Sequence, residues 1–269
     1  MELPKIVLLG SGNLATHVGL ALYEAGVEVK QVFSRDLSNA TLLASQIAAS
    51  ATNDLSLLYT DADIYLFALK DSVLPEVVSK VASLSLGEGT LGQSAALFLH
   101  TAGSVPLALF EGKVLHGGVF YPMQTFSKAR AVDFRVIPIF IEATTPEDTE
   151  VLETLAFRIS TQVTRLSSEQ RKYLHLGAVL SCNFVNHLFT LCSEVLAKQD
   201  IPFETMWPLI QETIQKVHQL SPQEAQTGPA VRYDRNIIDS QLALLEGDQR
   251  VQDIYRLFSE SIYAHSNSH

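Results

Sequence analysis

Small residues occur near the start of the chain at a spacing that can bind phosphate, in the run Gly10-Ser11-Gly12-Asn13-Leu14-Ala15. Gly10 permits a tight turn, Gly12 lets a pyrophosphate approach the backbone, and Ala15 lets the following helix pack closely. The free N–H groups and the positive dipole end of that helix would face the phosphates. This spacing predicts dinucleotide binding when a strand precedes the turn and a helix follows it.

The flanking sequence supplies those elements. Lys5 to Leu9 is an apolar run of strand length, Leu14 to Ala25 has apolar residues at helical spacing, and Val27 to Phe33 has the pattern of a second strand. A strand, a glycine turn, a helix and a strand in this order predict a Rossmann unit rather than an ordinary turn. The residues of the turn that we expect to bind the cofactor are Gly10, Ser11, Gly12, Asn13 and Leu14.

The end of the second strand indicates which dinucleotide binds. NAD sites usually place Asp or Glu there to bond the ribose 2′-hydroxyl, whereas NADP sites use Arg. Here Ser34 can bond a 2′-phosphate and Arg35 can pair with it. Asp36 would be the NAD-type acid after a slip of one residue, but together with Ser38 it fits the cap of the next helix, Asn39 to Ala49. NADP is therefore favoured over NAD.

Composition and charge exclude several kinds of partner. A chain of 269 residues suits one large domain or two of ordinary size, and its net charge of −10 argues against nucleic acid and anionic membranes. We expect no signal peptide and no metal site, because neither pattern occurs. The two cysteines, Cys182 and Cys192, lie about 15 Å apart on one predicted helix, too far for a disulfide. We therefore expect a reduced, cytoplasmic protein.

Strands and helices continue to alternate as far as Leu166. Ile64 to Leu69 suits a central parallel strand, and Ala95 to Leu99 is the next strand. Ligands of doubly wound sheets lie beyond the carboxyl ends of the strands, and small residues there leave room for a nicotinamide ring. The residues expected to border the cofactor at these ends are Ala68, Leu69, Lys70, Thr101 and Ala102. For Lys70, a solvated loop charge is an equally good interpretation.

The predicted fold class is α/β. Arg135 to Ile141 is expected to be a strand, Pro146 to Ile159 a helix and Gln162 to Leu166 the last strand. After that the chain is predicted to be entirely helical. We therefore predict an N-terminal Rossmann domain with a doubly wound, mostly parallel sheet over residues 1–166, followed by an all-helical substrate and dimerisation domain over residues 167–269.

The longest predicted helix, Leu174 to Leu196, is apolar on nearly every side. It is long enough to span a bilayer, but polar residues interrupt it, so we predict a buried helix that contacts the first domain and a partner subunit. At roughly 100° per residue, five polar residues in this helix or just before it fall within an arc of about 80°. They are Lys172, His175, Asn183, Asn186 and Thr190. Such a stripe faces either bonding partners or a wet cleft, and we favour the cleft.

Three side chains are candidates for proton transfer, in the order His175, His100, Tyr121. His175 lies on the polar stripe, and His100 follows a strand. Tyr121 lies in a segment, residues 114–126, whose glycines and proline are typical of an active-site rim. For His100 the sequence favours slightly a second interpretation, a buried histidine that bonds a neighbouring carbonyl.

The sequence resembles the superfamily that includes pyrroline-5-carboxylate reductase, 6-phosphogluconate and 3-hydroxyisobutyrate dehydrogenases, and prephenate dehydrogenase. The residues that carry the resemblance are the glycine run, Ser34-Arg35 and Tyr121-Pro122-Met123. His100 to Ser104 and Thr227 to Ala230 resemble a poorly characterised bacterial branch of it. The resemblance covers the whole layout and implies a Rossmann domain joined to a helical domain that usually dimerises.

The sequence departs from these enzymes at catalytic positions. The hydroxyacid dehydrogenases use a Lys and an Asn one turn apart on the long helix, but here Val179 precedes Asn183 and Cys182 precedes Asn186. Prephenate dehydrogenases have a His where Tyr121 stands. Pyrroline-5-carboxylate reductase needs less acid–base machinery, because a protonated imine already accepts hydride well. Reduction of an imine and reduction of a ketone both remain open.

We predict an NADP-dependent oxidoreductase that transfers a hydride to or from a small, anionic imine, keto or hydroxy metabolite bound between the two domains. The residues expected to act on the substrate are His175, Asn183, Asn186, His100 and Tyr121. The partners expected are this small molecule and a second copy of the chain, bound through the helical domain. The alternative is a non-catalytic NADP-binding redox sensor or regulatory dimer, which the missing Lys and the replaced His favour. A weaker one is a nucleotide-sugar or S-adenosylmethionine site, against which Ser34-Arg35 argues.

Overall fold

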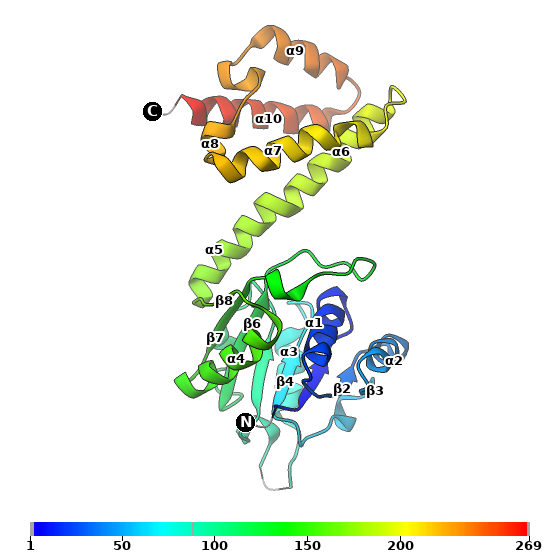
Figure 1. Cartoon of the computed structure of the whole chain (residues 1–269), viewed down its shortest axis with the longest axis vertical. Coiled ribbons are helices and arrows are strands. Elements are labelled where there is room, and N and C mark those ends of the chain that lie inside the picture. The colour runs from blue at the N-terminus through cyan, green and yellow to red at the C-terminus, as the bar shows by residue number, and fades with distance from the viewer. Residues whose placement is uncertain (1–2, 88, 268–269) are drawn as a thin grey trace. The chain divides into compact units, whose positions relative to one another are not determined.

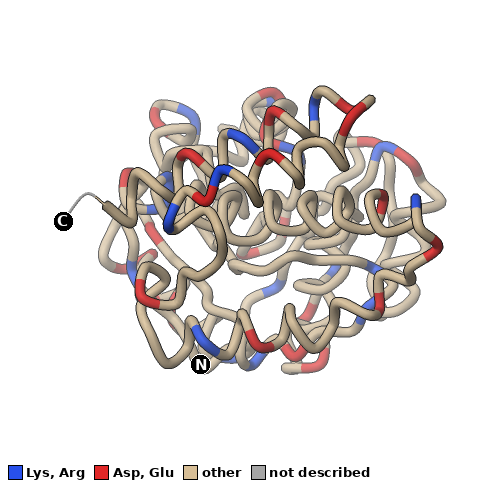
Figure 2. The backbone as a smooth tube through the Cα atoms, turned by 90° about the horizontal axis from the view of Figure 1, so that it is seen from above, with Lys and Arg blue, Asp and Glu red and all other residues tan. Residues whose placement is uncertain are grey.

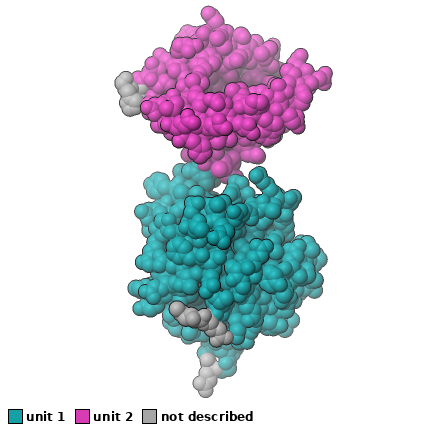
Figure 3. All heavy atoms as spheres, viewed as in Figure 1, with its two compact units in different colours: residues 1–179 teal, residues 180–269 magenta. Residues whose placement is uncertain are grey.

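The computed structural model describes residues 3–87 and 89–267 and divides into two compact units, Met1–Val179 and Leu180–His269 (Figure 3). The first unit holds the sheet, and the secondary structure of the second unit, over its described residues 180–267, is helical (Figure 1). Acidic and basic residues are interspersed along the chain (Figure 2). The helix that follows the sheet lies in the first unit as far as Val179, whereas the domain division predicted from the end of the strand–helix alternation falls at residue 166.

The sheet has eight strands in the order β3-β2-β1-β4-β5-β6-β7-β8. Its strands are β1 (Ile6–Leu9), β2 (Val29–Phe33), β3 (Ser50–Thr52), β4 (Ile64–Phe67), β5 (Leu97–His100), β6 (His116–Pro122), β7 (Ile139–Ala143) and β8 (Val163–Arg165). The β6–β7 pair is antiparallel and every other neighbouring pair is parallel. The predicted α/β class with a doubly wound, mostly parallel sheet is therefore confirmed.

The central strands lack polar alternation because both of their faces are covered. In β1, Ile6 and Leu8 belong to one core, whereas Val7 and Leu9 belong to a second core. The first core includes residues of α1 (Asn13–Glu24), α2 (Leu37–Gln46) and α4 (Pro146–Ile159), and the second includes residues of α3 (Leu74–Ala82). All four residues of β1, and likewise of β4 and β5, are buried. Together these strands form a rigid support for the loops that follow them.

Two strand predictions needed correction. The strand expected from Arg135 begins at Ile139, because Asp133 caps a 3-10 turn, η4 (Phe134–Val136), its Oδ1 accepting the Arg135 N–H at 3.0 Å. Pro138 then has no N–H to offer a strand. The short strand β3 was not predicted, and it pairs along β2 from Gln31 to Phe33.

The helix after β8 is longer than predicted and changes its winding. It consists of α5 (Ser168–Ala178), a π-helical segment η5 (Val179–Phe184) and α6 (Val185–Ala197). By length and composition alone, Ser168–Ala197 could cross a membrane, with a mean hydropathy of 1.3. The expected burial on nearly every side does not occur within the single chain, where Leu191 is the buried residue of α6. Burial by a partner subunit stays a prediction.

The second unit is completed by further helices, which agrees with the predicted helical C-terminal region. Its further elements are η6 (Phe203–Met206), α7 (Trp207–Gln219), α8 (Pro222–Ala225), η7 (Pro229–Arg232), α9 (Arg235–Leu244) and α10 (Gln249–Ser266). Gly228, with φ +109°, immediately precedes Pro229 and forms the turn that leads into η7.

Candidate active site

The glycine turn after β1 has the geometry of a phosphate-binding turn. Gly10 has φ +131°, and a Cβ there would lie 2.2 Å from the carbonyl oxygen of Ala68, so only glycine fits. A Cβ on Gly12 would meet nothing within 4 Å, so the space beside this residue is open. Helix α1 begins at Asn13 with no side-chain cap and no acidic residue in its first turn. Its first N–H groups are therefore free to bind an anion.

The end of β2 lies against this turn. The Ser11 hydroxyl donates to Oγ of Ser34 at 2.8 Å, which joins the two segments expected to hold the phosphates. Arg35 is exposed and, within residues 3–87 and 89–267, makes no ion pair. Its guanidinium is thus available for a 2′-phosphate.

Asp36 is the cap of α2, as predicted. Its Oδ1 accepts hydrogen bonds from the Ser38 hydroxyl at 2.6 Å and the Ser38 N–H at 2.9 Å. These bonds, the hydroxyl first, hold the pKa of the Asp36 carboxyl below its usual value. Because the carboxylate is occupied by the cap, it is not free to serve as the acid of an NAD site.

The other residues predicted to border the cofactor follow β4 and β5. Ala68 donates its N–H to Leu9 at 2.8 Å, and Thr101 donates its N–H to Phe67 at 3.2 Å. Thr101 and Ala102 are buried. The Lys70 carbonyl accepts the N–H groups of Val73 and Leu74 at the start of α3, while the Lys70 side chain is exposed. Because β1, β4 and β5 are parallel neighbours, the glycine turn and these residues, with Leu69, lie at the same edge of the sheet.

Two predicted proton donors, Tyr121 and His175, lie in contact at this edge. The hydroxyl of Tyr121, on β6, lies 3.0 Å from Nδ1 of His175, on α5, and the rings meet edge to face at 71°. A Cβ on Gly103 would lie 2.6 Å from that Nδ1 and 2.9 Å from Cζ of Tyr121. Gly103 therefore leaves the space in which the two side chains meet, directly after Thr101 and Ala102.

The Tyr121 hydroxyl lies in a mixed electrostatic environment. Burial raises its pKa, the positive charge of Arg171 opposes this effect, and the negative charge of Asp71 adds to it. Asp71 is held in place because its Oδ2 accepts a short hydrogen bond from the Ser104 hydroxyl, which ties the loop after β4 to the loop after β5. The phenol is therefore protonated at neutral pH, the form that can donate a proton.

His100 has the features of a structural residue. It is completely buried, its Nδ1 accepts the Ala102 N–H at 3.2 Å, and its ring stacks on Phe110 at 5.6 Å. Burial first, and then the charge of Arg171, lower the pKa of His100 to about 3, although the Pro106 backbone opposes this shift. A ring that stays neutral and has no access to solvent is unsuited to donate a proton. The interpretation of His100 as a buried structural residue is therefore the better one. The group bonded to its Nδ1 is the Ala102 N–H and not the expected carbonyl.

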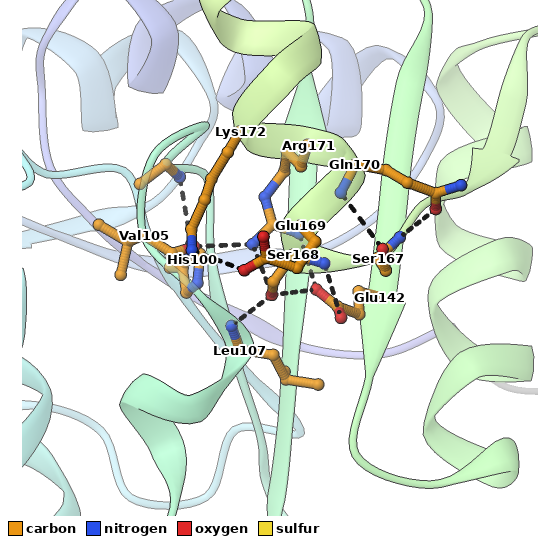
Figure 4. Close-up of polar contacts among 11 residues, drawn as sticks. His100, Val105, Leu107, Glu142, Ser167, Ser168, Glu169, Gln170, Arg171 and Lys172 are labelled. Carbon is orange, nitrogen blue, oxygen red and sulfur yellow. Dashed lines mark hydrogen bonds and ion pairs between the residues drawn. The ribbon is translucent and has the colours of Figure 1, made fainter.

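Arg171 is a buried residue beside this pair that the sequence analysis did not single out. Only 1% of its surface is exposed, and it donates to Glu142 Oε2 and to the Val105 carbonyl, each at 2.7 Å (Figure 4). The available sequence signal was its position one helical turn before His175, which places both on one face. An arginine in a polar helix start is ordinarily exposed, so its type alone gave no reason to expect burial.

Asn183 and Asn186 belong to the second unit. Asn183 lies in the π-helical segment, and the carbonyl of Asn186 accepts a hydrogen bond from the Thr190 hydroxyl at 3.3 Å. Both side chains are exposed. A π-helical turn shifts the phase of the residues after it, so the single arc expected for the polar stripe does not persist through the whole helix. The roles of both residues stay predictions.

Comparison with known proteins identifies the family. Residues 5–90 match the model for NADP oxidoreductases, coenzyme F420-dependent, and residues 137–262 match a domain of unknown function (DUF2520). The chain is 48% identical to a Bacteroides fragilis protein classed as an NADP oxidoreductase. The match to its crystal structure has a TM-score of 0.90 and covers 97% of this chain and 98% of the other. The chain therefore belongs to the NADP oxidoreductases, and its cofactor is NADP, as predicted.

More distant structures share the fold. A reductive aminase from Aspergillus terreus, in complex with NADPH and ethyl-5-oxohexanoate, is 16% identical with a TM-score of 0.68, and the match covers 99% of this chain and 93% of the other. A pyrroline-5-carboxylate reductase from Coxiella burnetii is 15% identical with a TM-score of 0.56, covering 99% and 98%. No functionally curated protein matches the sequence significantly.

Proposed function

We propose that the protein is an enzyme that transfers a hydride between NADP and a small, anionic metabolite with an imine, keto or hydroxy group. The observation that carries this proposal is the contact between Tyr121 and His175, 3.0 Å apart, next to the buried residues Thr101 and Ala102. A reduction needs both a hydride donor and a proton donor within hydrogen-bond reach of the reacting heteroatom. This edge of the sheet offers a place for both.

The glycine turn and the end of β2 are suited to hold NADP. The free N–H groups at the start of α1 would bind the pyrophosphate, and Ser34 and Arg35 would bind the 2′-phosphate. When bound, the reduced cofactor supplies the hydride that reaches the carbon of the C=N or C=O group. Thr101 and Ala102 would border the nicotinamide.

Tyr121 is the proton donor in this proposal. The proposal requires the tautomer of His175 that carries its proton on Nδ1, so that this N–H donates to the phenol oxygen 3.0 Å away and leaves the phenol proton for the substrate heteroatom. As the hydride adds to carbon, the heteroatom takes that proton and Tyr121 becomes a phenolate, which the His175 bond stabilises. Exchange with solvent through the half-buried His175 then restores the phenol. The reverse order of steps oxidises an amine or an alcohol.

The first test measures cofactor binding and then turnover. Fluorescence titration should give tighter binding of NADPH than of NADH, and Arg35→Ala should reduce NADPH affinity by about 10- to 100-fold, because a charge-assisted phosphate contact contributes about 1.5–3 kcal/mol. Lys80→Ala is the control, since this exposed charge lies in the last turn of α3 and not among the residues expected to border the cofactor. Equal loss for NADPH and NADH in Arg35→Ala would contradict the assignment of the 2′-phosphate site.

Turnover distinguishes the enzyme from the alternative, a redox sensor or regulatory dimer. NADPH oxidation with a panel of anionic imines and keto acids should fall by about 10²-fold or more in Tyr121→Phe, the usual lower range for loss of a general acid. Binding of NADPH without turnover of any compound in either direction would favour the sensor.

Two further parts of the prediction remain proposals. We propose a homodimer formed through the helical unit, because large apolar side chains there are exposed, among them Leu209 (60%), Leu244 (76%) and Leu257 (67%). Sedimentation equilibrium should give twice the mass of 29.6 kDa, and a monomer at micromolar concentration would contradict the proposal.

We also propose a cytoplasmic location, which the two free cysteines support.

A further inference from the structure

Arg171 lies at the centre of a buried polar network. Besides its bonds to Glu142 and Val105, its Nη2 donates to the Ser168 hydroxyl at 3.2 Å. Ser168 in turn donates its N–H and its hydroxyl to the two Glu142 carboxylate oxygens, at 2.9 and 2.6 Å, and its hydroxyl oxygen accepts the Leu107 N–H at 2.9 Å. Figure 4 shows the guanidinium between the segment of Val105 and the strand of Glu142.

This network fixes the start of α5 to two other parts of the first unit. Glu142 belongs to β7, and Val105 and Leu107 belong to the segment after β5 that also carries Gly103. His175 is one helical turn after Arg171, on the same face of α5. Because the helix is held at Arg171, the position of His175 relative to Tyr121 is fixed.

The network also sets the charge around the phenol. Among the described residues, His175 from α5 lies 3.0 Å from the Tyr121 hydroxyl, and the charges of Arg171, also on α5, and of Asp71, in the loop after β4, act on it. Glu142 on β7 pairs with Arg171 at 2.7 Å, and the neutral His100 on β5 is a further titratable group that feels the charge of the guanidinium. Of these groups Arg171 is the permanent positive charge, and it is almost completely removed from solvent screening.

We propose that Arg171 is a positioning residue for the proton-donating pair: it holds His175 against Tyr121, and its charge stabilises the phenolate that remains after Tyr121 has given up its proton. The inference rests on the proposed function for the meaning of the proton step. The two parts of the role, support and charge, make different predictions and can be separated.

The experiment compares two variants that break the same ion pair, Arg171→Gln and Glu142→Gln. Both lose the Arg171–Glu142 contact of 2.7 Å, so a purely structural role predicts the same direction of change in both. The charge role predicts opposite directions, because one variant removes the positive charge and the other leaves it uncompensated. Arg171→Lys keeps the positive charge but loses the forked hydrogen bonds of the guanidinium. In this variant the pKa of Tyr121 should lie between the values of the wild type and of Arg171→Gln.

The readout is the titration of Tyr121 itself, which needs no substrate. 3-Fluorotyrosine replaces all eight tyrosines, and Tyr121→Phe identifies the fluorine NMR signal of residue 121. Fluorine lowers the pKa of a phenol, which brings the titration into a range where the protein stays folded. We expect the pKa of residue 121 to rise in Arg171→Gln and to fall, or to stay at the wild-type value, in Glu142→Gln.

The outcomes separate the inference from the proposed function. An unchanged pKa in Arg171→Gln, or a rise in both variants, would overturn the charge role even if the enzyme turns over imines. The expected opposite shifts would support it even if no substrate is found. If Arg171→Gln does not fold, the double variant Arg171→Met with Glu142→Leu replaces the buried pair by apolar side chains. The pKa of residue 121 should then lie above the value in Glu142→Gln, and an equal or lower value would overturn the inference.

Discussion

A methyl group added at Gly103 should separate Tyr121 from His175. The new Cβ would lie 2.6 Å from Nδ1 of His175 and 2.9 Å from Cζ of Tyr121, both closer than carbon contacts allow. Tyr121 is 8% exposed and fixed within the sheet, whereas His175 is half-buried at the helix surface, so His175 is the side chain that moves. We therefore expect Gly103→Ala to break the 3.0 Å contact and to leave the fold intact.

The magnitude follows from the two effects of that methyl group. Overpacking of one methyl against movable side chains should cost about 1 kcal/mol of stability, the lower end of the usual range. The lost hydrogen bond stabilises the developing phenolate by about 1–2 kcal/mol, which corresponds to a roughly 5- to 30-fold slower reduction. Tyr121→Phe should cost more, because it removes the proton itself.

The assay combines thermal unfolding with turnover of any compound that the substrate panel identifies. Gly177→Ala is the matched control, because it lies on the same helix as His175 and a Cβ there meets nothing within 4 Å. Its turnover should equal that of the wild type, with a stability gain of up to about 1 kcal/mol. Wild-type turnover in Gly103→Ala would refute the argument that the Tyr121–His175 contact is used in the reaction.

Two other predictions concern the cofactor turn and the buried histidine. Gly10→Ala should abolish NADPH binding, because φ is +131° and the Cβ would lie 2.2 Å from the Ala68 carbonyl oxygen; Gly26→Ala, with φ +79° but open space around its Cβ, should keep it in the same fluorescence titration. His100 should make the protein sensitive to acid: its pKa is about 3 when folded and 6.5 when free, so the unfolded state binds the proton more tightly. The contribution of neutral His100 to the free energy of unfolding should be fully present above pH 6.5 and should be lost as the pH decreases from there toward 3. Thermal unfolding at a series of pH values can follow this loss. His100→Gln should flatten that part of the curve, and a wild-type slope in this variant would contradict the assignment.

Local sequence patterns were sufficient to predict most elements of the first unit. The glycine turn, the buried strands β1, β4 and β5, and α4 from Pro146 to Ile159 occur where the sequence predicts them. Each of these elements is predicted by a signal that lies within about ten residues, such as apolar periodicity, a cap or a required turn conformation. Errors arose where a neighbouring element decides the structure. One is the short β3, which exists because the β2 edge offers it partners.

The sequence by itself predicted the candidate cofactor site, because Gly10, Gly12, Ser34 and Arg35 lie on one strand–turn–helix–strand unit that local pattern specifies. Only the tertiary structure paired Tyr121 with His175, which are 54 residues apart in the chain. The same is true of burial, because the sheet and the segment after β5, rather than the residue's own type, enclose Arg171. A sequence pattern specifies local backbone geometry. Which side chains touch, which are buried and how they are protonated depend on the distant segments that the fold places together.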